Sequence, residues 1–406
     1  MDDNLGAGQG WRFAKRTQWD VSDNEFSARM AELKKDGRPL FDLTVSNPLR
    51  CGLDLSGLDI AGSFDKDGLL DYRPDPLGLP SAREVVKAYY AEKGVNVPAS
   101  RLLLTASTSD AYSYIFRLLC EADDEVLIPA PSYPLFSFLA DISDVRLKSY
   151  ALEIGEDGLW RMNRTAFMEA LTVRTRAIIV VNPNNPSGSF VRSEDLDFML
   201  AVAKERKIAI ICDEVFADYA LDAGADAVPT LAGRCGGVLS FVLSGISKIL
   251  ALPQMKLAWM LVQGPEDVLE VALKRLEIIA DSYLSVNTPV MLAFGDWMGR
   301  RSEVQALLQA RLRENVQAMN EIFRDYEGLD ALRVEGGWYA LLRMKGVYNE
   351  ESFVLRLMED ERVAVHPGYF YDFAEGAHAV LGLLTPTGLW REGLMRLAAY
   401  HRKHAL

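Results

Sequence analysis

The sequence predicts an α/β protein with a large domain, in which helices cover a mostly parallel sheet, and a smaller α+β domain. Short continuous apolar runs, as at 177–181 and 208–212, alternate with segments of helical length. Such runs are typical of parallel strands that are buried on both faces. The 406 residues exceed what one ordinary core contains. Past residue 266 the pattern turns mostly helical and then mixes strands and helices again, which indicates the second unit.

The first elements of the chain are expected to be a helix at 25–35 and a short strand at 41–45. The strand is followed by the turn Ser46-Asn47-Pro48-Leu49-Arg50. A second helix is expected at 80–93, because its leading proline suits a first helical turn. The stretch 81–84 resembles a capping box, which would fix where that helix begins.

Strands and helices then alternate along the chain. Strands are expected at 101–105, 125–128, 145–151, 177–181, 208–212, 238–243 and 257–262, and helices at 109–120, 165–171 and 193–206. The C-terminal part is expected to mix strands and helices and to end in an amphipathic helix from about residue 390. This order predicts a large domain at 76–299 and a small domain formed by 1–75 and 300–406, including an N-terminal arm.

Composition restricts the class of function. The 44 Lys and Arg residues are outnumbered by 57 Asp and Glu residues, and the formal net charge of -13 argues against a nucleic-acid-binding surface. We expect no membrane segment, because no apolar stretch has spanning length and the start of the chain is polar. The four cysteines are scattered without a CxxC pair, so we expect reduced thiols and a cytoplasmic protein. The sequence contains no HExxH motif, so we do not expect a metal hydrolase.

Two polar clusters follow predicted strands, and ligands of parallel α/β sheets bind beyond the carboxyl ends of strands. Residues 105–110 read TASTSD at the start of a predicted helix, where hydroxyls and free N–H groups suit a phosphate. An ordinary capped helix would give the same pattern. Residues 182–188 read NPNNPSG, a proline-fixed turn whose amides suit a ring oxygen or a carboxylate. The alternative is a plain surface turn.

Two further residues, Asp213 and Lys248, carry the predicted chemistry. Asp213 ends an apolar strand, where a carboxylate needs a cationic partner such as a protonated pyridine nitrogen. It would otherwise cap the next segment. Lys248 follows a small polar turn between two apolar runs, where the protein can desolvate its amine for a Schiff base. A surface loop lysine is the alternative for Lys248 taken alone.

The order N-P-N-N-P-S-G, D-E-V and S-x-x-S-K resembles that of the class I and II aminotransferases, which use pyridoxal 5'-phosphate and have fold type I. The resemblance extends from Tyr72 to the C-terminal helix. It implies an enzyme that moves an amino group between an α-amino acid and a 2-oxo acid by a ping-pong mechanism. Because fold does not fix reaction, a pyridoxal-phosphate-dependent lyase, cyclase or decarboxylase on the same scaffold remains the alternative.

The resemblance also implies a role for each residue of the site. Lys248 would form the Schiff base and carry the proton, Asp213 would pair with the pyridine nitrogen, and Asn185 would donate to the ring 3'-oxygen. Tyr133 would stack on the ring. Residues expected around the phosphate are Ser107, Thr108, Ser109, Ser247 and Lys256. Tyr72 would reach the phosphate of a second subunit, which implies a homodimer with shared active sites.

Three positions depart from the family pattern. Phe216 replaces a tyrosine that donates to the 3'-oxygen, and Lys256 replaces an arginine, which keeps the charge without the bidentate fork. Val380 occupies the position of the arginine that binds the substrate α-carboxylate. In the turn at 46–50, which lines the substrate side in the family, we expect Asn47 and Arg50 to contact substrate and Arg50 to supply the missing cation. Arg50 as a solvated loop residue is the alternative.

Overall fold

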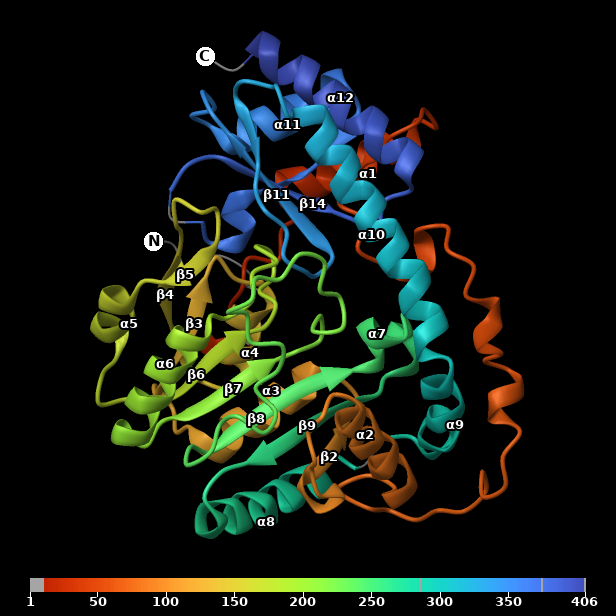
Figure 1. The fold of residues 1–406 in the computed structure, drawn as a ribbon, viewed down its shortest axis with the longest axis vertical. Coiled ribbons are helices and arrows are strands. Elements are labelled where there is room, and N and C mark those ends of the chain that lie inside the picture. The colour runs from red at the N-terminus through yellow and green to blue at the C-terminus, as the bar shows by residue number, and fades with distance from the viewer. Residues whose placement is uncertain (1–10, 285, 374, 405–406) are drawn as a thin grey trace.

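A computed structural model describes residues 11–284, 286–373 and 375–404. Within these residues the largest sheet has eight strands in the order β2-β9-β8-β7-β6-β3-β4-β5 (Figure 1). Their bounds are β2 (Leu102–Thr105), β3 (Glu125–Ala130), β4 (Arg146–Ile154), β5 (Trp160–Met162), β6 (Thr175–Val181), β7 (Ala209–Asp213), β8 (Ser240–Gly245) and β9 (Ala258–Gln263). β9 runs antiparallel to β2 and β8, and β5 antiparallel to β4, while the other neighbours are parallel. The prediction of a mostly parallel sheet is confirmed.

Helices cover both faces of this sheet because alternate residues of its strands point to opposite sides. In β6, Ile179 packs into one hydrophobic core, and Ile178 and Val180 pack into another. The helices around the sheet are α2 (Pro80–Glu92), α3 (Thr108–Leu119), α4 (Leu135–Ile142), α5 (Arg164–Ala170), α6 (Ser193–Arg206), α8 (Glu266–Tyr283) and α9 (Thr288–Gly299). Buried residues of α3, α4 and α8 share a core with Ile179, whereas α2, α5, α6 and α9 contribute to the other core.

A second, four-stranded sheet lies above the first in Figure 1, in the order β10-β11-β14-β13. Its strands are β10 (Leu329–Ala331), β11 (Tyr339–Met344), β13 (His366–Pro367) and β14 (His378–Gly382). Around it lie α1 (Glu25–Lys35), α11 (Glu350–Asp360), α12 (Thr387–His404) and the upper part of α10 (Arg301–Phe323). The N-terminal segment completes this part, because β1 (Phe41–Asp42) pairs in parallel with β12 (Val363–Ala364).

Short helices occur in several of the connections between these elements. They are η1 (Lys15–Thr17), η2 (Pro48–Arg50), η3 (Ser56–Leu58), η4 (Gly62–Phe64), η5 (Ala99–Arg101), α7 (Ile246–Ile249), η6 (Pro253–Met255) and η7 (Gly368–Tyr371). The segment after η2 runs down the outer side of the molecule (Figure 1). In this segment Phe64 packs edge-on against Trp297 of α9, with the two ring centroids 5.6 Å apart.

Most predicted elements occur within a few residues of their expected bounds, and α6 has the bounds that the sequence predicts. The expected capping box at 81–84 is wrong, because Leu79 is the N-cap and Pro80 is already the first helical residue. The predicted strand at 41–45 shortens to β1, and α4 and β5 have no counterpart in the prediction.

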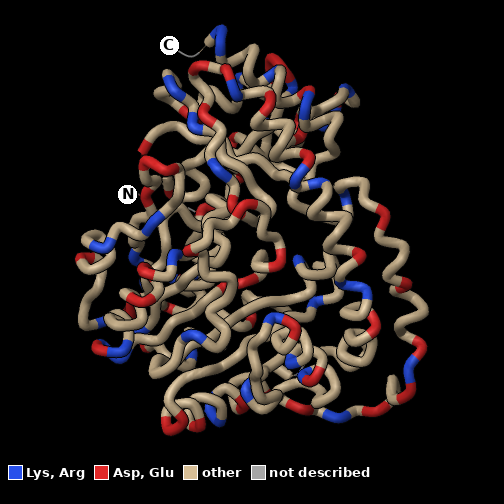
Figure 2. The backbone as a smooth tube through the Cα atoms, in the orientation of Figure 1, with Lys and Arg blue, Asp and Glu red and all other residues tan. Residues whose placement is uncertain are grey.

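Along the backbone of the described residues, positions of Lys and Arg are interspersed with positions of Asp and Glu (Figure 2). Among the described residues, no helix has both the length and the apolarity that crossing a membrane requires.

Candidate active site

Three of the predicted motifs meet at one edge of the large sheet. β6, β7 and β8 are adjacent, and Asp213 at the end of β7 pairs in register with Val181 and with Leu243. The N–H of Asn182 donates to the Asp213 carbonyl at 2.8 Å, so the NPNNPSG turn begins beside the aspartate. Lys248 lies in α7, directly after β8. Because the carboxyl ends of parallel strands share an edge, residues from distant parts of the sequence converge there.

Lys248 has a largely desolvated amine. Its Nζ lies 5.4 Å from the centroid of the Phe216 ring and 4.8 Å from that of Trp338. Burial lowers the pKa of Lys248 to about 8, although the charge of Asp213 opposes this shift. The hydroxyl of Tyr219 donates to the Lys248 carbonyl at 2.6 Å and so fixes the backbone of α7. An amine with this pKa is partly neutral near pH 7 and can act as a nucleophile.

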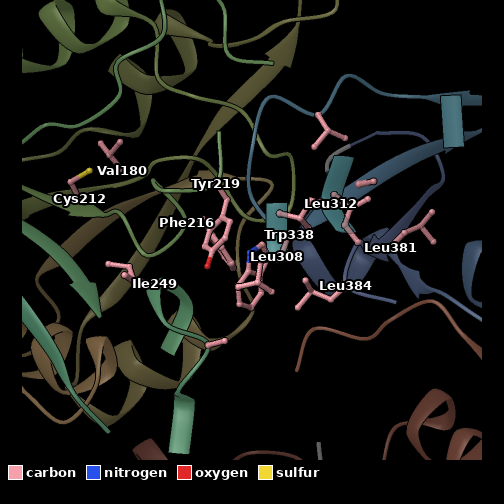
Figure 3. Close-up of a cluster of buried hydrophobic side chains, with 14 of the residues drawn as sticks. Val180, Cys212, Phe216, Tyr219, Ile249, Leu308, Leu312, Trp338, Leu381 and Leu384 are labelled. Carbon is pink, nitrogen blue, oxygen red and sulfur yellow. The ribbon is translucent and has the colours of Figure 1, made fainter. Parts of the chain in front are cut away.

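The aromatic wall beside Lys248 comes from both sheets. Figure 3 shows Phe216, from the loop after β7, and Tyr219 gathered against Trp338, which precedes β11. Ring centroids of Phe216 and Trp338 are 5.4 Å apart, and those of Tyr219 and Trp338 are 5.2 Å apart. This wall excludes water from one side of the amine.

Asp213 is a buried carboxylate, with 8% of its surface exposed. Burial raises its pKa to about 6, while hydrogen bonds and the charge of Lys248 act in the opposite direction. The Val215 N–H donates to Oδ1 at 3.1 Å, and the Tyr112 hydroxyl donates to Oδ2 at 3.2 Å. Two neutral donors do not compensate a fully desolvated anion, so a cationic group placed here would be stabilised.

Asn185 presents an unpaired amide oxygen in the same region of the described chain. Its neighbour Asn184 is fixed by a hydrogen bond from its Nδ2 to the Pro131 carbonyl at 3.2 Å and by one from the Ser187 hydroxyl at 2.8 Å. By contrast, Asn185 Oδ1 and the Ser132 hydroxyl are buried and have no hydrogen-bond partner among the described atoms. Unpaired polar atoms of this kind are uncommon in native proteins and indicate a missing ligand or water.

The start of α3 forms the opposite end of the site. Ser107 is its N-cap, and its side chain accepts a hydrogen bond from the Asp110 N–H at 3.1 Å. Thr108 and Ser109 are half-buried in the first turn, where helical N–H groups lack internal acceptors and favour an anion. Tyr112, which contacts Asp213, follows one turn later, about 6 Å along the axis at a rise of 1.5 Å per residue. These residues therefore fit a molecule with a phosphate at one end and a basic nitrogen at the other.

The remaining predicted residues lie at different distances from this centre. Tyr133 is half-exposed, and its pKa is raised by burial and by the charge of Asp213, which places its phenol near that carboxylate. Ser247 is half-buried in α7, whereas Lys256 is exposed after η6 and has no ion pair within the described chain. Tyr72 is 79% exposed and makes no recorded contact with the centre.

The turn at 46–50, where the sequence predicts contacts to substrate, carries Asn47 and Arg50. The Asn47 side chain accepts a hydrogen bond from the Leu49 N–H at 3.0 Å. Ser46 lies against the Tyr339 hydroxyl, and the Tyr339 ring packs edge-on against Phe216 at 6.2 Å. Arg50 ends η2 with an exposed side chain, which forms no ion pair with any described residue.

Apolar residues pack around Val380 on β14. Val380 is fully buried against Leu341, Tyr371 and Trp160. Its other register neighbour, His366, shares a hydrogen bond of 3.1 Å with the Tyr371 hydroxyl. Burial lowers the pKa of His366 to about 4, although Asp42 opposes this, so the ring is neutral at pH 7. None of these four neighbours carries a positive charge at pH 7, so together they form an uncharged wall.

Tyr112 is one residue of this centre that sequence reasoning missed. Tyr112 comes four residues after Thr108, so it lies on the same face of α3 as a residue predicted to bind the phosphate. This spacing is the one feature of the sequence that could have indicated its role. The contact with Asp213 bridges residues 101 positions apart, which no local pattern indicates.

The chain is similar to a known protein family and to several single relatives. The family model described as aminotransferase class I and II matches residues 64–378. The glutamate-pyruvate aminotransferase AlaA of Haemophilus influenzae is 22% identical over 375 residues, which are 91% of this chain and 92% of that protein. Its Escherichia coli counterpart is 23% identical over 348 residues, 84% and 85% of the two chains.

Among solved structures, an alanine aminotransferase from Pyrococcus furiosus has a similar fold, with a TM-score of 0.85 and 24% identity. The similarity covers 97% of this chain and 100% of that one.

Proposed function

Because the chain belongs to the class I and II aminotransferases, we propose that the centre around Lys248 and Asp213 is its active site. The protein is a fold type I enzyme whose cofactor is pyridoxal 5'-phosphate, and it moves an amino group between an α-amino acid and a 2-oxo acid. The observation that supports this assignment best is the pairing of a desolvated amine at Lys248 with a buried carboxylate at Asp213.

When bound, pyridoxal phosphate supplies an aldehyde that condenses with amines and a ring that accepts electrons. In our proposal Lys248 Nζ would hold the aldehyde carbon, and after its release would take a proton from the substrate Cα and deliver it to the cofactor carbon that carried the aldehyde. Asp213 keeps the ring nitrogen protonated, which satisfies the buried carboxylate. The wall of Phe216 and Trp338 excludes water while Lys248 moves the proton.

Other residues orient the cofactor. Asn185, at the turn that begins beside Asp213, would donate its amide N–H to the ring 3'-oxygen. Tyr133 would cover one ring face. The start of α3, with Ser107, Thr108 and Ser109, would bind the phosphate together with Ser247 and the cation of Lys256. For the substrate we propose Asn185, Asn47 and Arg50.

The amino-group transfer can be tested directly with purified enzyme. Single amino acids are mixed with the loaded enzyme in the absence of acceptor, and the visible spectrum and the released products are recorded. Conversion of the cofactor to its amine form, with stoichiometric oxo-acid release, supports transamination in two half-reactions. Release of ammonia or carbon dioxide with an unchanged spectrum would instead indicate a lyase or decarboxylase, the alternative that Val380 keeps open.

Phe216 allows a prediction about the spectrum of the loaded enzyme. Its ring lies beside Lys248 and lacks a hydroxyl, so the ring 3'-oxygen keeps the Asn185 donor alone. An anionic 3'-oxygen with fewer hydrogen-bond donors is less stable. The nitrogen that links Lys248 to the cofactor should therefore keep its proton up to a higher pH. We expect the visible absorbance to titrate at a higher pH in wild type than in Phe216→Tyr. Equal midpoints, or a higher midpoint in the variant, would contradict this.

We also propose that the enzyme is a cytoplasmic homodimer with domains at 76–299 and at 1–75 plus 300–406. The four cysteines are unpaired, which suits a reducing compartment. The segment around Tyr72 supports the dimer, because Leu70 and Tyr72 are exposed apolar residues on an extended stretch. In a dimer Tyr72 would reach the phosphate at the partner's site.

Shared active sites make a complementation experiment informative. Tyr72→Ala and Lys248→Ala subunits are each expected to have low activity alone. Mixed dimers contain one site with both native residues, so mixing after partial unfolding and refolding should restore activity above either parent. Activity that stays at the mean of the two parents would show that each site uses its own Tyr72. The molecular mass in solution supplies the dimer control.

A further inference from the structure

The Asp213 carboxylate receives one side-chain hydrogen bond among the described residues, and it comes from a different element. The other donor, the Val215 N–H, belongs to the loop that follows Asp213 itself. Tyr112 reaches Oδ2 from α3 and is 2% exposed. The centroid of its ring lies 6.0 Å from that of Phe116 and 5.2 Å from that of Phe136, which it meets edge-on. The hydrophobic core therefore fixes the position of Tyr112.

The other titratable groups that face Asp213 differ from Tyr112 in what they can do. Lys248 provides a cation but is committed to the cofactor, and the Tyr133 phenol is half-exposed. Cys212 precedes Asp213 on β7, and burial holds its thiol neutral by raising its pKa well above the usual value. The pKa of Tyr112 is likewise raised well above 10 by burial and by Asp213, so its hydroxyl remains a donor throughout the working pH range.

We propose that Tyr112 is a positioning residue that holds Asp213 ionised and oriented toward the ring nitrogen of the cofactor. This inference rests on the proposed pairing of Asp213 with that nitrogen. A buried carboxylate that loses a donor favours its protonated form, in which it no longer stabilises a protonated ring nitrogen. Because α3 carries both Tyr112 and the proposed phosphate cradle, one rigid helix would set the positions of both ends of the cofactor.

Tyr112→Phe tests this, since it removes the hydroxyl and keeps the ring in the core. In the cofactor-free protein, infrared bands of the carboxyl group, assigned by their loss in Asp213→Asn, report the titration of Asp213. We expect a pKa near 6 in wild type and a value higher by roughly one in Tyr112→Phe. The dissociation constant for pyridoxal phosphate should rise about tenfold, and kcat should fall while the KM for the amino donor changes little.

Tyr150→Phe is the matched control. Tyr150 is buried, and its hydroxyl donates to the Ile179 carbonyl at 2.9 Å without touching Asp213. Tyr150→Phe should lower the melting temperature about as much as Tyr112→Phe does. It should leave the Asp213 titration and the cofactor affinity unchanged. In the Asp213→Asn background, Tyr112→Phe should have no further effect on cofactor affinity, because Tyr112 acts through the carboxylate.

The inference is overturned if Tyr112→Phe matches Tyr150→Phe in the Asp213 titration and in cofactor affinity, or if its effect is additive with Asp213→Asn. If Asp213→Asn itself binds the cofactor as wild type does, the proposed role of Asp213 fails, and that result is distinguishable. Should Tyr112→Phe fold poorly, replacement of Tyr112 by 3-fluorotyrosine, a more acidic phenol and stronger donor, should lower the pKa of Asp213. No change with 3-fluorotyrosine would overturn the inference as well.

Discussion

Lys248→Ala is expected to abolish covalent capture of pyridoxal phosphate and to lower the transamination rate by at least about a thousandfold. The substitution removes both the amine that would hold the cofactor and the group that would carry the Cα proton, and a positioned acid–base group alone contributes about 10²–10⁴-fold. After borohydride reduction, peptide mapping of wild type should place the pyridoxyl group on the peptide containing Lys248. The variant should carry no label.

The pH dependence of capture provides a second test of Lys248. Since burial lowers its pKa from 10.5 to about 8, the neutral amine becomes the main form above pH 8. Capture by the cofactor-free enzyme should therefore accelerate between pH 7 and 9 and then level off. An exposed lysine would continue to accelerate beyond pH 10.

Lys256→Ala is the control, because Lys256 is exposed and is assigned only to the phosphate. It should weaken cofactor affinity and keep the label on Lys248. A label on Lys256 in wild type, or a bound-cofactor absorbance that survives in Lys248→Ala, would contradict the assignment.

The residues that local patterns reveal are those at strand ends. Asp213 and Lys248 each follow a run of buried apolar residues, and the strands that carry them were predicted close to their observed bounds. In a parallel sheet the ends of such strands meet, so the sequence predicts a shared site without any knowledge of contacts. Helix α6 occurs at its predicted bounds, and its buried apolar residues Leu196, Met199 and Val202 recur every three residues.

What the sequence could not reveal depends on packing between distant segments. β5 pairs with the end of β4. With three residues, β5 is too short to show the alternation of apolar and polar residues that marks a strand. α4 has only eight residues and is mostly apolar, so at this length its pattern does not distinguish a helix from a buried strand. The contact of Tyr112 with Asp213 and the uncharged surroundings of Val380 arise only when separate strands and helices come together.

The uncharged wall around Val380 leads to the second large expected effect. A substrate carboxylate that is desolvated in the closed site requires a cation or several donors. Leu341, Tyr371 and Trp160 supply no charge, and His366 is neutral at pH 7. Lys248 and Lys256 are assigned to the cofactor. We propose that Arg50 binds the carboxylate, because it ends the turn whose Ser46 lies against Tyr339, one ring away from Phe216.

Arg50→Ala should therefore weaken the reaction with amino acids by a large factor and leave cofactor binding intact. Removing one partner of a charge pair in a closed site costs about 2–5 kcal/mol, or roughly 30-fold to several thousandfold. Single-turnover rates of wild type, Arg50→Ala and Arg50→Lys, measured over a range of donor concentrations, give the effect on binding and on chemistry separately. Arg50→Lys should recover part of the loss, since it keeps the charge without the bidentate fork.

Arg38→Ala is the matched control, because Arg38 is an exposed arginine of the same N-terminal region that pairs with Asp36. It should react as wild type does, and the bound-cofactor spectrum should be the same in all variants. An Arg50→Ala enzyme with wild-type rates and affinities would show that Arg50 is a solvated loop residue. Another group that binds the carboxylate, or a substrate that does not need this contact, would then have to be sought.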